Sequence, residues 1–569
     1  MRHYKTGHNP IKDNKASWLV FGLFTALLFC QTLLFDYFAF RGETGYSLYS
    51  GWEVTSMVFC KLGASMLFAS FVFLLRDKRW ILLLSFVIDT WMVANLIYMR
   101  NNHILLDAEA FNMSGNLHGY FWSVLIYIEW GIDLLFYGLT AVFGLVFLVI
   151  PKKTERLPWW WIGVIGIAVF TRLAGEGVYV LDQNNTTYDP FPYIREHREP
   201  VYGTHFPRTV QLTSILYSPL YIITDYYLMV NDIQPTRPLT EQDMQTIAKI
   251  DYPATDTTRL DSPLIIVLVE SLENWVVTPE IMPNLYRLIN NEHVFYANRV
   301  HTQIVGAPSA DGQMIVNTGL LPINAGGTCL HYDHNTYPAI MKLAPEKAVC
   351  LLPHDTCVWN QTHMSPAYGY DTTICYTDID TILFRKLDSL VDDGIRYIQC
   401  ITQSTHAPFV NEQYSSLELP KDMPWVMYNF IRGFNALDEG LGYFIRKIET
   451  DPKLQQYTIV ITGDHRILHY EKRQQMQAYA DAHHMNLEPA NDCLPVVIYS
   501  PKIRHNTRYT GDAYQMDIFP TYKALIGAKD YHWHGFGVNL MDPDAKRLIP
   551  EDEAYLLSDK IIRNNYFAH

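Results

Sequence analysis

Positively charged residues are scarce in this sequence of 569 residues. It has 44 Lys and Arg against 58 Asp and Glu, which gives a formal net charge of −14. A protein that binds nucleic acid needs a basic face for the phosphate backbone. The sequence also lacks internal repeats and low-complexity tracts. We therefore expect no nucleic-acid partner and no repeat architecture.

Cysteine is also infrequent, with eight residues in the whole chain. Cys30 and Cys60 lie in apolar segments. The other six lie in the later part of the chain, at Cys329, Cys350, Cys357, Cys375, Cys400 and Cys493. An even number is compatible with disulfides in an oxidising compartment, and buried free thiols are the alternative.

Long apolar runs, in contrast, are abundant near the start. Each is long enough to cross the hydrocarbon core of a bilayer as a helix. The first is too long for a cleavable signal peptide and lacks a cleavage pattern. The sequence predicts a five-helix transmembrane domain over residues 17–182, with spans at Ser17–Phe40, Val54–Leu75, Trp80–Met99, Phe121–Ile150 and Trp159–Leu181.

The orientation of these spans follows from the basic residues that flank them, because Lys and Arg are enriched on the cytoplasmic side. Basic residues precede the first span and join spans two to three and four to five. They are Arg2, Lys5, Lys12, Lys15, Arg76, Lys78, Arg79, Lys152, Lys153 and Arg156. Residues 1–16 are predicted to be a cytosolic tail. An odd number of crossings then places the rest of this multi-pass cell-membrane protein on the periplasmic or extracellular side.

Five ionisable residues lie within or near the spans: Asp89, Glu129, Asp133, Arg172 and Glu176. Charge inside a membrane is costly and marks either a function or a paired structural group. Structural pairing and a role in handling a lipid head group are both open here.

Residues 183–260 are polar and irregular, which predicts a juxtamembrane linker. It contains one apolar stretch, Leu212–Val230, which Pro219 and Asp225 interrupt. A sixth crossing there would put the cysteine-bearing part in the cytosol. We interpret the stretch as a helix lying on the outer membrane surface.

Residues 261–569 show strands alternating with helices, which predicts an α/β domain with a mainly parallel sheet. The predicted strands are Leu264–Val269, Ala348–Leu352, Ile395–Ile401, Thr458–Thr462 and Leu494–Tyr499. The predicted helices are Met282–Asn291, Ala310–Thr318 and Asn429–Glu449.

Two of these strands end in potential metal ligands. The first stops at Glu270, and the fourth is followed by Gly463, Asp464 and His465. Ligands gather at the carboxyl ends of parallel strands, and oxygen and nitrogen atoms bind divalent metals. A capped turn at 463–465 and an acidic first helical turn at Glu270 are the alternatives.

Further polar residues follow at related positions. His354 and His406 come just past the second and third strands. Pro308 and Ser309 open a helix, where free amide N–H groups and the helix dipole suit an anionic phosphoryl group. Ser309 is therefore a candidate nucleophile, with an ordinary N-cap as the alternative.

The order of these motifs resembles the sulfatase-like branch of the alkaline phosphatase superfamily over about residues 262–540. The matching motifs are the acid at Glu270, Met-Pro-Asn-Leu-Tyr-Arg-Leu at 282–288, the hydroxyl at Ser309, Ala-Leu-Asp at 436–438, Ile-Val-Ile-Thr-Gly-Asp-His at 459–465 and Met-Asp-Ile-Phe-Pro-Thr at 517–522. With apolar spans before it, the chain most resembles the lipoteichoic acid synthase group of membrane phosphoglycerol transferases.

That resemblance implies a set of site residues. Glu270, Ser309, Asp464 and His465 would bind one divalent metal ion, with Mn²⁺ as first choice and Mg²⁺ or Zn²⁺ as alternatives. Ser309 would also be the nucleophile, and His406 the second catalytic residue, as a proton donor. The substrate-binding positions are Trp359, His406, Gln361 and His354, and Gln361 stands where the family has an arginine that holds an anionic group.

The implied reaction transfers a phosphoglycerol-type head group from a membrane phospholipid, phosphatidylglycerol or phosphatidylethanolamine, to a glycan or lipid acceptor through a phospho-serine. A phosphoethanolamine transferase, a sulfatase-like phosphodiesterase or hydrolase, and an inactive membrane sensor are the alternatives. True sulfatases need Cys or Ser two residues before the proline and Arg two residues after it. Gly306 and Ala310 occupy those places, which argues against sulfate-ester chemistry.

Overall fold

The structure is a computed structural model of the chain. It divides into two compact units, Met1–Gln234 and Pro235–His569, which we describe separately. The residues it describes are 10–40, 51–102, 105–106, 110–111, 127–150, 156–182, 211, 213–223, 238–250, 260, 262–323, 327–343, 347–376, 380–393, 395–407, 409, 411–466, 470–526 and 531–568.

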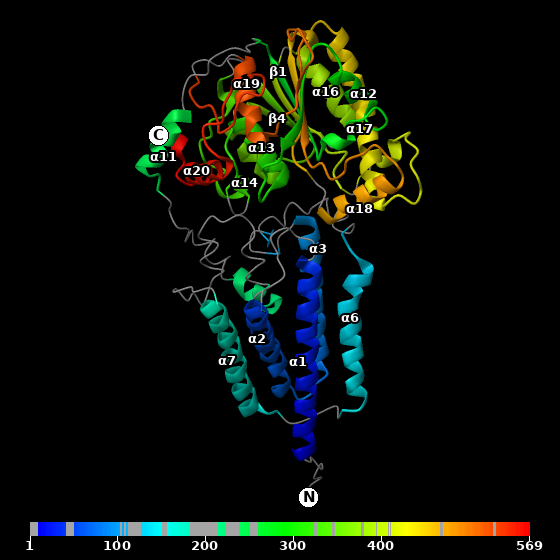
Figure 1. Ribbon diagram of the computed structural model, residues 1–569, viewed down its shortest axis with the longest axis vertical. Helices are drawn as coiled ribbons and strands as arrows, with labels where there is room; N and C mark the ends of the chain where they lie inside the picture. Colours follow the sequence, from blue (N-terminus) through cyan, green and yellow to red (C-terminus); the bar gives the residue numbers. More distant parts are fainter. Residues whose placement is uncertain are drawn as a thin grey trace, which may run out of the picture. The chain divides into compact units, whose positions relative to one another are not determined.

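The N-terminal unit is a bundle of long helices (Figure 1). Their apolar side chains pack into one core and also cover much of the outside, as in helices surrounded by lipid. The helices are α1 (Pro10–Phe40), α2 (Gly51–Ala69) with the 3₁₀ turn η1 (Ser70–Phe73), α3 (Trp80–Asn102), α6 (Trp130–Gly144) with η3 (Leu145–Leu148), and α7 (Pro158–Asp182).

Four segments in the described part of the chain are long and apolar enough to cross a membrane: Lys15–Phe40, Val54–Phe73, Trp80–Arg100 and Trp130–Leu148. The predicted count of five is therefore wrong. The fifth predicted span is helical, as α7, but Arg172 and Glu176 interrupt its apolar sequence. The predicted domain limits of 1–16, 17–182, 183–260 and 261–569 stay predictions.

The ionisable residues of the helices have protein partners. Arg100 Nη2 lies 2.8 Å from Asp133 Oδ1, and Gln31 donates to Asp89 over 2.8 Å. Arg172 lies over the Tyr217 ring, 4.2 Å from its centroid. Glu129 precedes α6, 3.9 Å from Arg100. These contacts favour structural pairing, while the Glu176 side chain lies outside the described part.

Part of the predicted surface helix falls in described residues 213–223. It contains the 3₁₀ turn η4 (Ile215–Tyr217) followed by helical residues. Its apolar side chains belong to the same core as the long helices, and Trp91 Nε1 donates to Ser218 Oγ over 2.9 Å. The segment thus packs on the bundle. Residues 224–230 lie outside the described part.

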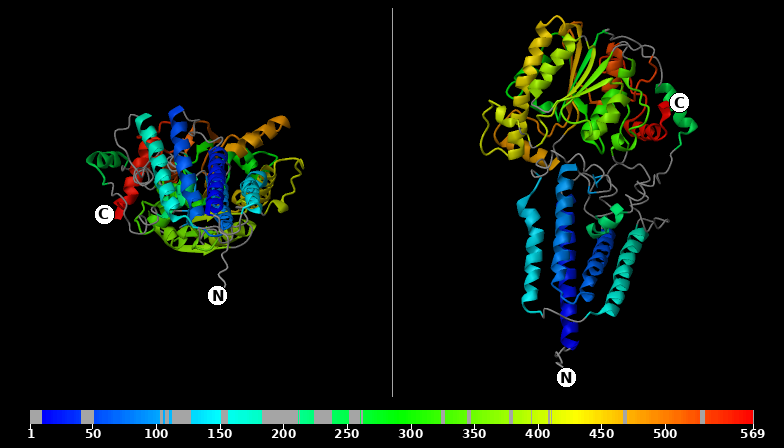
Figure 2. Two further views of the ribbon diagram at one scale, coloured as in Figure 1. Left: turned by 90° about the horizontal axis from the view of Figure 1, so that it is seen from below. Right: turned by 180° about the vertical axis from the view of Figure 1, so that it is seen from behind.

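The C-terminal unit is built on one mixed, mostly parallel sheet (Figures 1 and 2). The strand order is β4-β3-β5-β1-β6-β7-β2-β8, with β9 beside β2. Only the pairings of β7 with β6 and β2 are antiparallel among the described strands. The strands are β1 (Leu264–Val269), β2 (Val294–His301), β3 (Ala348–Leu352), β4 (Thr372–Cys375), β5 (Tyr397–Ile401), β6 (Thr458–Gly463), β7 (Leu494–Tyr499), β8 (Thr507–Tyr509) and β9 (Ala513–Tyr514).

Helices cover both faces of this sheet (Figures 1 and 2). One layer holds α12 (Pro283–Ile289), α16 (Asp380–Asp392) and α17 (Trp425–Thr450). The opposite layer holds α13 (Pro308–Thr318) and α19 (Ile518–Ile526). The central strands are fully buried, as expected for parallel strands covered on both sides. The remaining helices of the unit are α11 (Glu241–Ile250), α14 (Thr328–His331), α15 (Gln361–Ala367), α18 (Tyr470–Ala482) and α20 (Glu551–Arg563).

The predicted α/β class and mainly parallel sheet are confirmed, and the five predicted strands correspond to β1, β3, β5, β6 and β7. The sequence analysis missed β2, β4, β8 and β9. The β2 sequence, Val-Phe-Tyr-Ala-Asn-Arg-Val-His, mixes apolar and polar residues because its second half is partly exposed. Short strands at the sheet margin carry little periodic signal.

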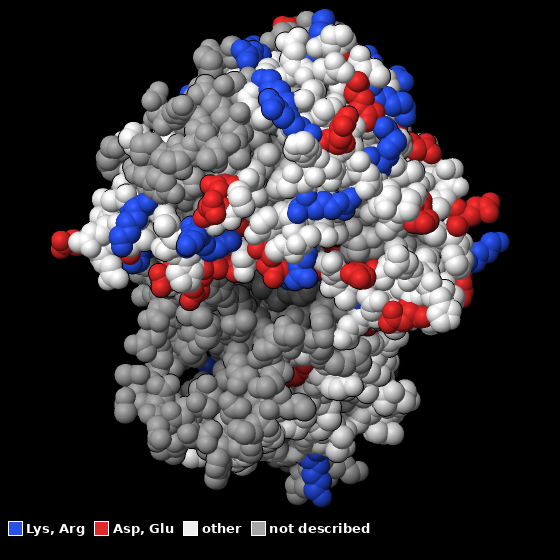
Figure 3. Space-filling model, turned by 45° about the horizontal axis from the view of Figure 1, so that its top comes forward, with Lys and Arg blue, Asp and Glu red and all other residues white. Residues whose placement is uncertain are grey.

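All eight cysteines are free thiols, so the disulfides considered from the sequence are not formed. Four of those in the C-terminal unit are buried and two, Cys357 and Cys375, are exposed. On the face of this unit shown in Figure 3, acidic and basic side chains are interspersed.

Candidate active site and metal centre

The strand order explains why residues far apart in sequence meet. Strands β3, β5, β1 and β6 are neighbours in the sheet and run parallel to one another. Their carboxyl ends therefore lie along one edge. The residues that follow them are His354, His406, Glu270, and Asp464 with His465. The predicted convergence of strand ends arises from four adjacent parallel strands.

Four of the predicted site residues come into direct contact. Ser309 Oγ donates to Glu270 Oε2 over 3.3 Å and lies 3.2 Å from His465 Nε2. His465 Nε2 lies 3.4 Å from Glu270 Oε1 and 3.5 Å from Asp464 Oδ2. Glu270, Asp464 and His465 are at most 6% exposed. Two carboxylates, an imidazole and a hydroxyl thus surround one point.

One oxygen at this point lacks a hydrogen-bond partner. Asp464 Oδ1 accepts from the backbone N–H of Ser271 and of His465, over 2.8 and 2.7 Å. Asp464 Oδ2 is buried and accepts no hydrogen bond. Burying an unsatisfied carboxylate oxygen is costly, so such an atom needs an explanation. A divalent cation bound between Asp464, Glu270 and His465 would supply the missing partner.

The orientation of His465 also suits metal binding. Its Nδ1–H donates to the carbonyl oxygen of Arg466 over 2.8 Å. This bond holds the ring and leaves the Nε2 lone pair directed at the carboxylates. Metal-binding histidines usually have their second nitrogen held in this way.

The pKa values show that the site favours a positive charge. Burial opposes the charge on His465, but the adjacent Asp464 and Glu270 carboxylates raise its pKa to about 10. Burial, and then the Glu270 charge, raise the pKa of Asp464 to about 7. Burial also opposes ionisation of Glu270, but the nearby His465 charge lowers its pKa below the ordinary value. A proton on His465 partly fills the place of a cation.

Ser309 is not the N-cap of its helix. The N-cap of α13 is Ala307, Pro308 takes the first helical position and Ser309 the second. Its hydroxyl points to Glu270 and His465, so the N-cap alternative is wrong. The helix approaches β6 so closely that a Cβ on Gly312 would lie 2.2 Å from the Asp464 carbonyl oxygen. Only glycine allows this approach.

The sequence analysis missed several residues that position these groups. Asp311 Oδ2 accepts from the backbone N–H of Val305, Gly306 and Ala307, and so shapes the turn before Ser309. Burial raises the pKa of Asp311 to about 7, although those hydrogen bonds favour its charge. Its place in the first turn of a helix was the available signal.

Other missed residues surround Glu270. Ser271 Oγ donates to Glu270 Oε1 over 2.6 Å, and Ser271 has a φ of 58°, a left-handed conformation that costs energy outside glycine. Thr402 Oγ1 accepts from the Glu270 N–H, and Thr405 Oγ1 donates to its carbonyl oxygen. Such tertiary contacts leave no local sequence pattern.

Comparisons with known proteins show which proteins this chain resembles. The Sulfatase family matches residues 313–528. Lipoteichoic acid synthase 2 of Bacillus subtilis is 21% identical over 329 residues, 52% of this chain and 50% of that protein. The lipoteichoic acid synthase-like protein YvgJ of Bacillus subtilis is 23% identical over 339 residues, 53% of this chain and 52% of that protein. The chain thus spans about half the length of the curated relatives it matches.

The fold is also that of a solved membrane protein. The structure of the integral membrane protein lipooligosaccharide phosphoethanolamine transferase A (EptA) from Neisseria meningitidis aligns with a TM-score of 0.51 at 12% identity. The alignment covers 88% of this chain and 95% of that one. The chain is therefore similar in sequence to lipoteichoic acid synthases over about half its length, and similar in fold to EptA.

His354 and His406 follow β3 and β5, which are neighbours in the sheet. Both interact electrostatically with Glu270. The charge of His406 favours ionised Glu270, and the charge of Glu270 favours protonated His354. His406 Nδ1–H donates to the Ala407 carbonyl over 2.6 Å, and His354 Nδ1–H donates to the Asp355 carbonyl over 3.0 Å. Burial lowers the pKa of His354. In each ring, the backbone contact fixes Nδ1 and so the orientation of the ring.

The predicted substrate positions Trp359 and Gln361 behave differently. Trp359 is partly exposed, and both it and Asn360 have positive φ, 50° and 53°. Strained backbone of this kind often marks a functional loop. Gln361 is 2% exposed, and its amide donates to Gln313 over 2.6 Å. Gln361 is thus held by other polar side chains, and its substrate-binding role stays a prediction.

Proposed function

We propose that the protein transfers a phospholipid head group through a covalent phospho-serine, with Ser309 as the nucleophile. The observation that carries this proposal is the contact of Ser309 Oγ with Glu270 and His465, beside the unsatisfied Asp464 Oδ2. The similarity to lipoteichoic acid synthase 2 and to a lipooligosaccharide phosphoethanolamine transferase supports the reaction class.

One divalent metal ion is part of the proposal, with Glu270, Ser309, Asp464 and His465 as its ligands. When bound, it would supply positive charge that favours the Ser309 alkoxide and the phosphoryl oxygens. Carboxylate, imidazole and hydroxyl ligands suit Mn²⁺, our first choice, and also Mg²⁺ or Zn²⁺.

The chain's own residues then account for both displacements. Ser309 Oγ attacks phosphorus, an O–P bond forms, and the bond from phosphorus to the lipid oxygen breaks. Diacylglycerol leaves with the proton that Ser309 gave up. A hydroxyl of a glycan or lipid acceptor later attacks the phosphorus of the phospho-serine, the Ser309 Oγ–P bond breaks, and the acceptor's proton returns to Ser309. His406 is the candidate for these proton transfers, because it is an imidazole whose ring is held by Ala407 and whose charge acts on Glu270.

Phosphoethanolamine is the second candidate head group, and one observation favours it. The family arginine that would hold an anionic group is replaced by Gln361, which is buried and bonded to Gln313 and Ser365. Nearby, Asp355 is exposed on the same loop. A loop with a carboxylate and without that arginine suits a head group that carries an ammonium.

We also propose that the catalytic unit lies on the periplasmic or extracellular side of the cell membrane. An even number of crossings would return the chain to the side of its basic N-terminus, so the proposal requires direct measurement. In intact cells, a membrane-impermeant maleimide should label the exposed Cys357 and Cys375. Labelling only after lysis would contradict this placement.

The function is tested with purified protein and vesicles that contain either phosphatidylglycerol or phosphatidylethanolamine. Diacylglycerol should be released from one of them with added Mn²⁺ and not with a chelator present. Ser309→Ala should reduce release to background, and Ser389→Ala, at an exposed serine on α16, should leave it unchanged. Mass spectrometry of the trapped phospho-serine identifies the head group. Full activity of Ser309→Ala would disprove the nucleophile assignment.

A further inference from the structure

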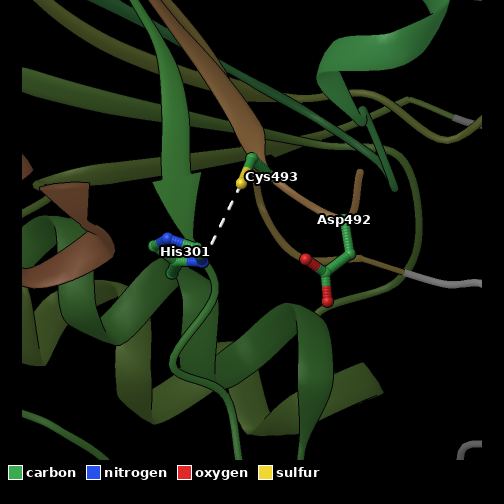
Figure 4. Close-up of side chains that lie close together, drawn as sticks. All are labelled: His301, Asp492 and Cys493. Carbon is green, nitrogen blue, oxygen red and sulfur yellow. Dashed lines mark hydrogen bonds between the residues drawn. The ribbon is translucent and has the colours of Figure 1, made fainter. Parts of the chain in front are cut away.

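A second group of potential metal ligands lies where β2 meets β7. In this antiparallel pair Val300 is opposite Leu494, so His301 at the end of β2 is opposite Cys493 just before β7. The carboxylate of Asp492 comes from the residue before Cys493. Figure 4 shows the Cys493 sulfur pointing at the His301 ring and the Asp492 carboxylate beside them.

The three side chains are spaced as ligands of one ion. Cys493 Sγ lies 3.8 Å from His301 Nδ1, and one ligand atom from each residue lies within 4.8 Å of the others. Sulfur and nitrogen ligands of a tetrahedral zinc ion are roughly 3.5 Å apart, given their bond lengths. Cys493 is buried, whereas His301 and Asp492 are partly exposed, which leaves a path for an ion and room for water.

The histidine is already held in the orientation that binding requires. Its Nε2 lies 3.2 Å from Asp512 Oδ1, and Arg299 donates to the same oxygen over 2.6 Å. A carboxylate on one ring nitrogen fixes the tautomer and leaves the other nitrogen free to bind metal. Here the other nitrogen is the one that faces Cys493.

The charges around this group are balanced. Arg299 pairs with Asp512 and Arg466 with Asp492, so an entering cation would compete with Arg466 for one carboxylate oxygen. Burial raises the pKa of Cys493 to about 11, so binding would release a thiol proton.

We propose that His301, Asp492 and Cys493 form a second metal site, which binds a sulfur-preferring divalent ion of the Zn²⁺ type with water as the fourth ligand. Thiolate and imidazole ligands select Zn²⁺ over Mn²⁺ and Mg²⁺. The site does not depend on the proposed transferase activity, because it shares no residue with the Ser309 cluster.

Cobalt is the most direct probe, since a cobalt–thiolate bond gives a near-ultraviolet charge-transfer band and the Ser309 cluster contains no sulfur. Full-length protein in detergent should develop this band on titration with Co²⁺ and lose it on addition of Zn²⁺. Excess Mg²⁺ should leave it unchanged. Zn²⁺ should also slow alkylation of Cys493 by iodoacetamide, measured by mass spectrometry.

Two variants and two controls make the test specific. Cys493→Ser and His301→Gln should each lose the band and one equivalent of bound Zn²⁺. Because His301 is partly exposed, its variant is informative even if Cys493→Ser folds poorly. Cys375→Ser, at an exposed thiol, should keep both signals, and Ser309→Ala should keep the cobalt–thiolate band. Absence of the band in the parent protein, or its persistence in His301→Gln, would overturn the proposal.

Discussion

Buried charge is treated in opposite ways in the helical unit and in the Ser309 cluster of the α/β unit. In the helical unit, Asp36 lies 2.8 Å from Lys61, and Asp133 lies 2.8 Å from Arg100. In the α/β unit, no Lys or Arg among the described residues forms an ion pair with Glu270 or Asp464. The ion-pair partner of both carboxylates in the described part is His465. Paired charges stabilise a fold. Carboxylates that converge without a permanent cation store free energy that a bound ion can release.

The largest expected effect comes from removing a carboxylate of the site. Asp464→Asn should lower kcat/KM by roughly 10³-fold, since metal ligation contributes several kcal/mol to transition-state stabilisation. Bound metal, measured by elemental analysis, should fall in parallel. The thermal midpoint of the metal-free protein should stay the same or rise, because Asp464 has an unsatisfied oxygen. If the metal-free variant lost much stability, the site carboxylates would be stabilising the fold as the ion pairs of the helical unit do.

Removing one member of an ion pair in the helical unit should have the reverse effect, with lower stability and unchanged activity. Lys61→Met leaves Asp36 buried without its partner and should destabilise the unit by about 3 kcal/mol. Thermal unfolding in detergent measures this cost. The double variant Lys61→Met/Asp36→Leu should recover most of it, while the activity per folded molecule stays constant throughout.

A smaller effect is expected where the helix of the nucleophile meets β6. Gly312→Ala would place a methyl group 2.2 Å from the Asp464 carbonyl oxygen. The helix must shift, and a displacement of about 1 Å at reacting groups costs roughly 10²-fold in rate. The matched control is Gly433→Ala on α17, where a Cβ has no neighbour nearer than 3.8 Å. An equal loss of rate in both variants would show that Gly312 has no special role.

The effect of pH on metal binding should be smaller still, because it comes from competition between protons and the metal. Because His465 has a pKa raised to about 10 and Asp464 one raised to about 7, protons occupy the site near neutral pH and a metal must displace them. Apparent metal affinity should therefore increase with pH, about tenfold per pH unit for each proton displaced. Isothermal titration at pH 6, 7 and 8 tests the sign. Affinity that falls with pH would exclude these ligands.

The smallest effect is expected at Ser271, which combines strain with a hydrogen bond. Ser271→Ala loses the bond to Glu270 and keeps the φ of 58°, whereas Ser271→Gly also relieves the strain. Both should lower kcat by about tenfold through the lost bond. Ser271→Gly should be more stable than Ser271→Ala by about 1 kcal/mol, as chemical denaturation would show.

Local patterns were sufficient for much of the candidate site. Glu270 and the pair Asp464 and His465 could be predicted because each ends a continuous apolar strand, and Ser309 because a proline opens its helix. The positions of Ser271, Thr402 and Thr405 could not be predicted, since their roles come from contacts between neighbouring strands. The burial of Gln361 could not be predicted either, because alignment to a motif gives no information on burial.

By itself, the sequence determined the buried central strands and the polar residues that end them, because hydrophobic periodicity and strand termination are local properties. The tertiary structure decided which strands are neighbours, and therefore that Glu270, Ser309 and His465 share one site. It alone placed His301 beside Cys493, since the register of an antiparallel pair joins residues that are distant along the chain.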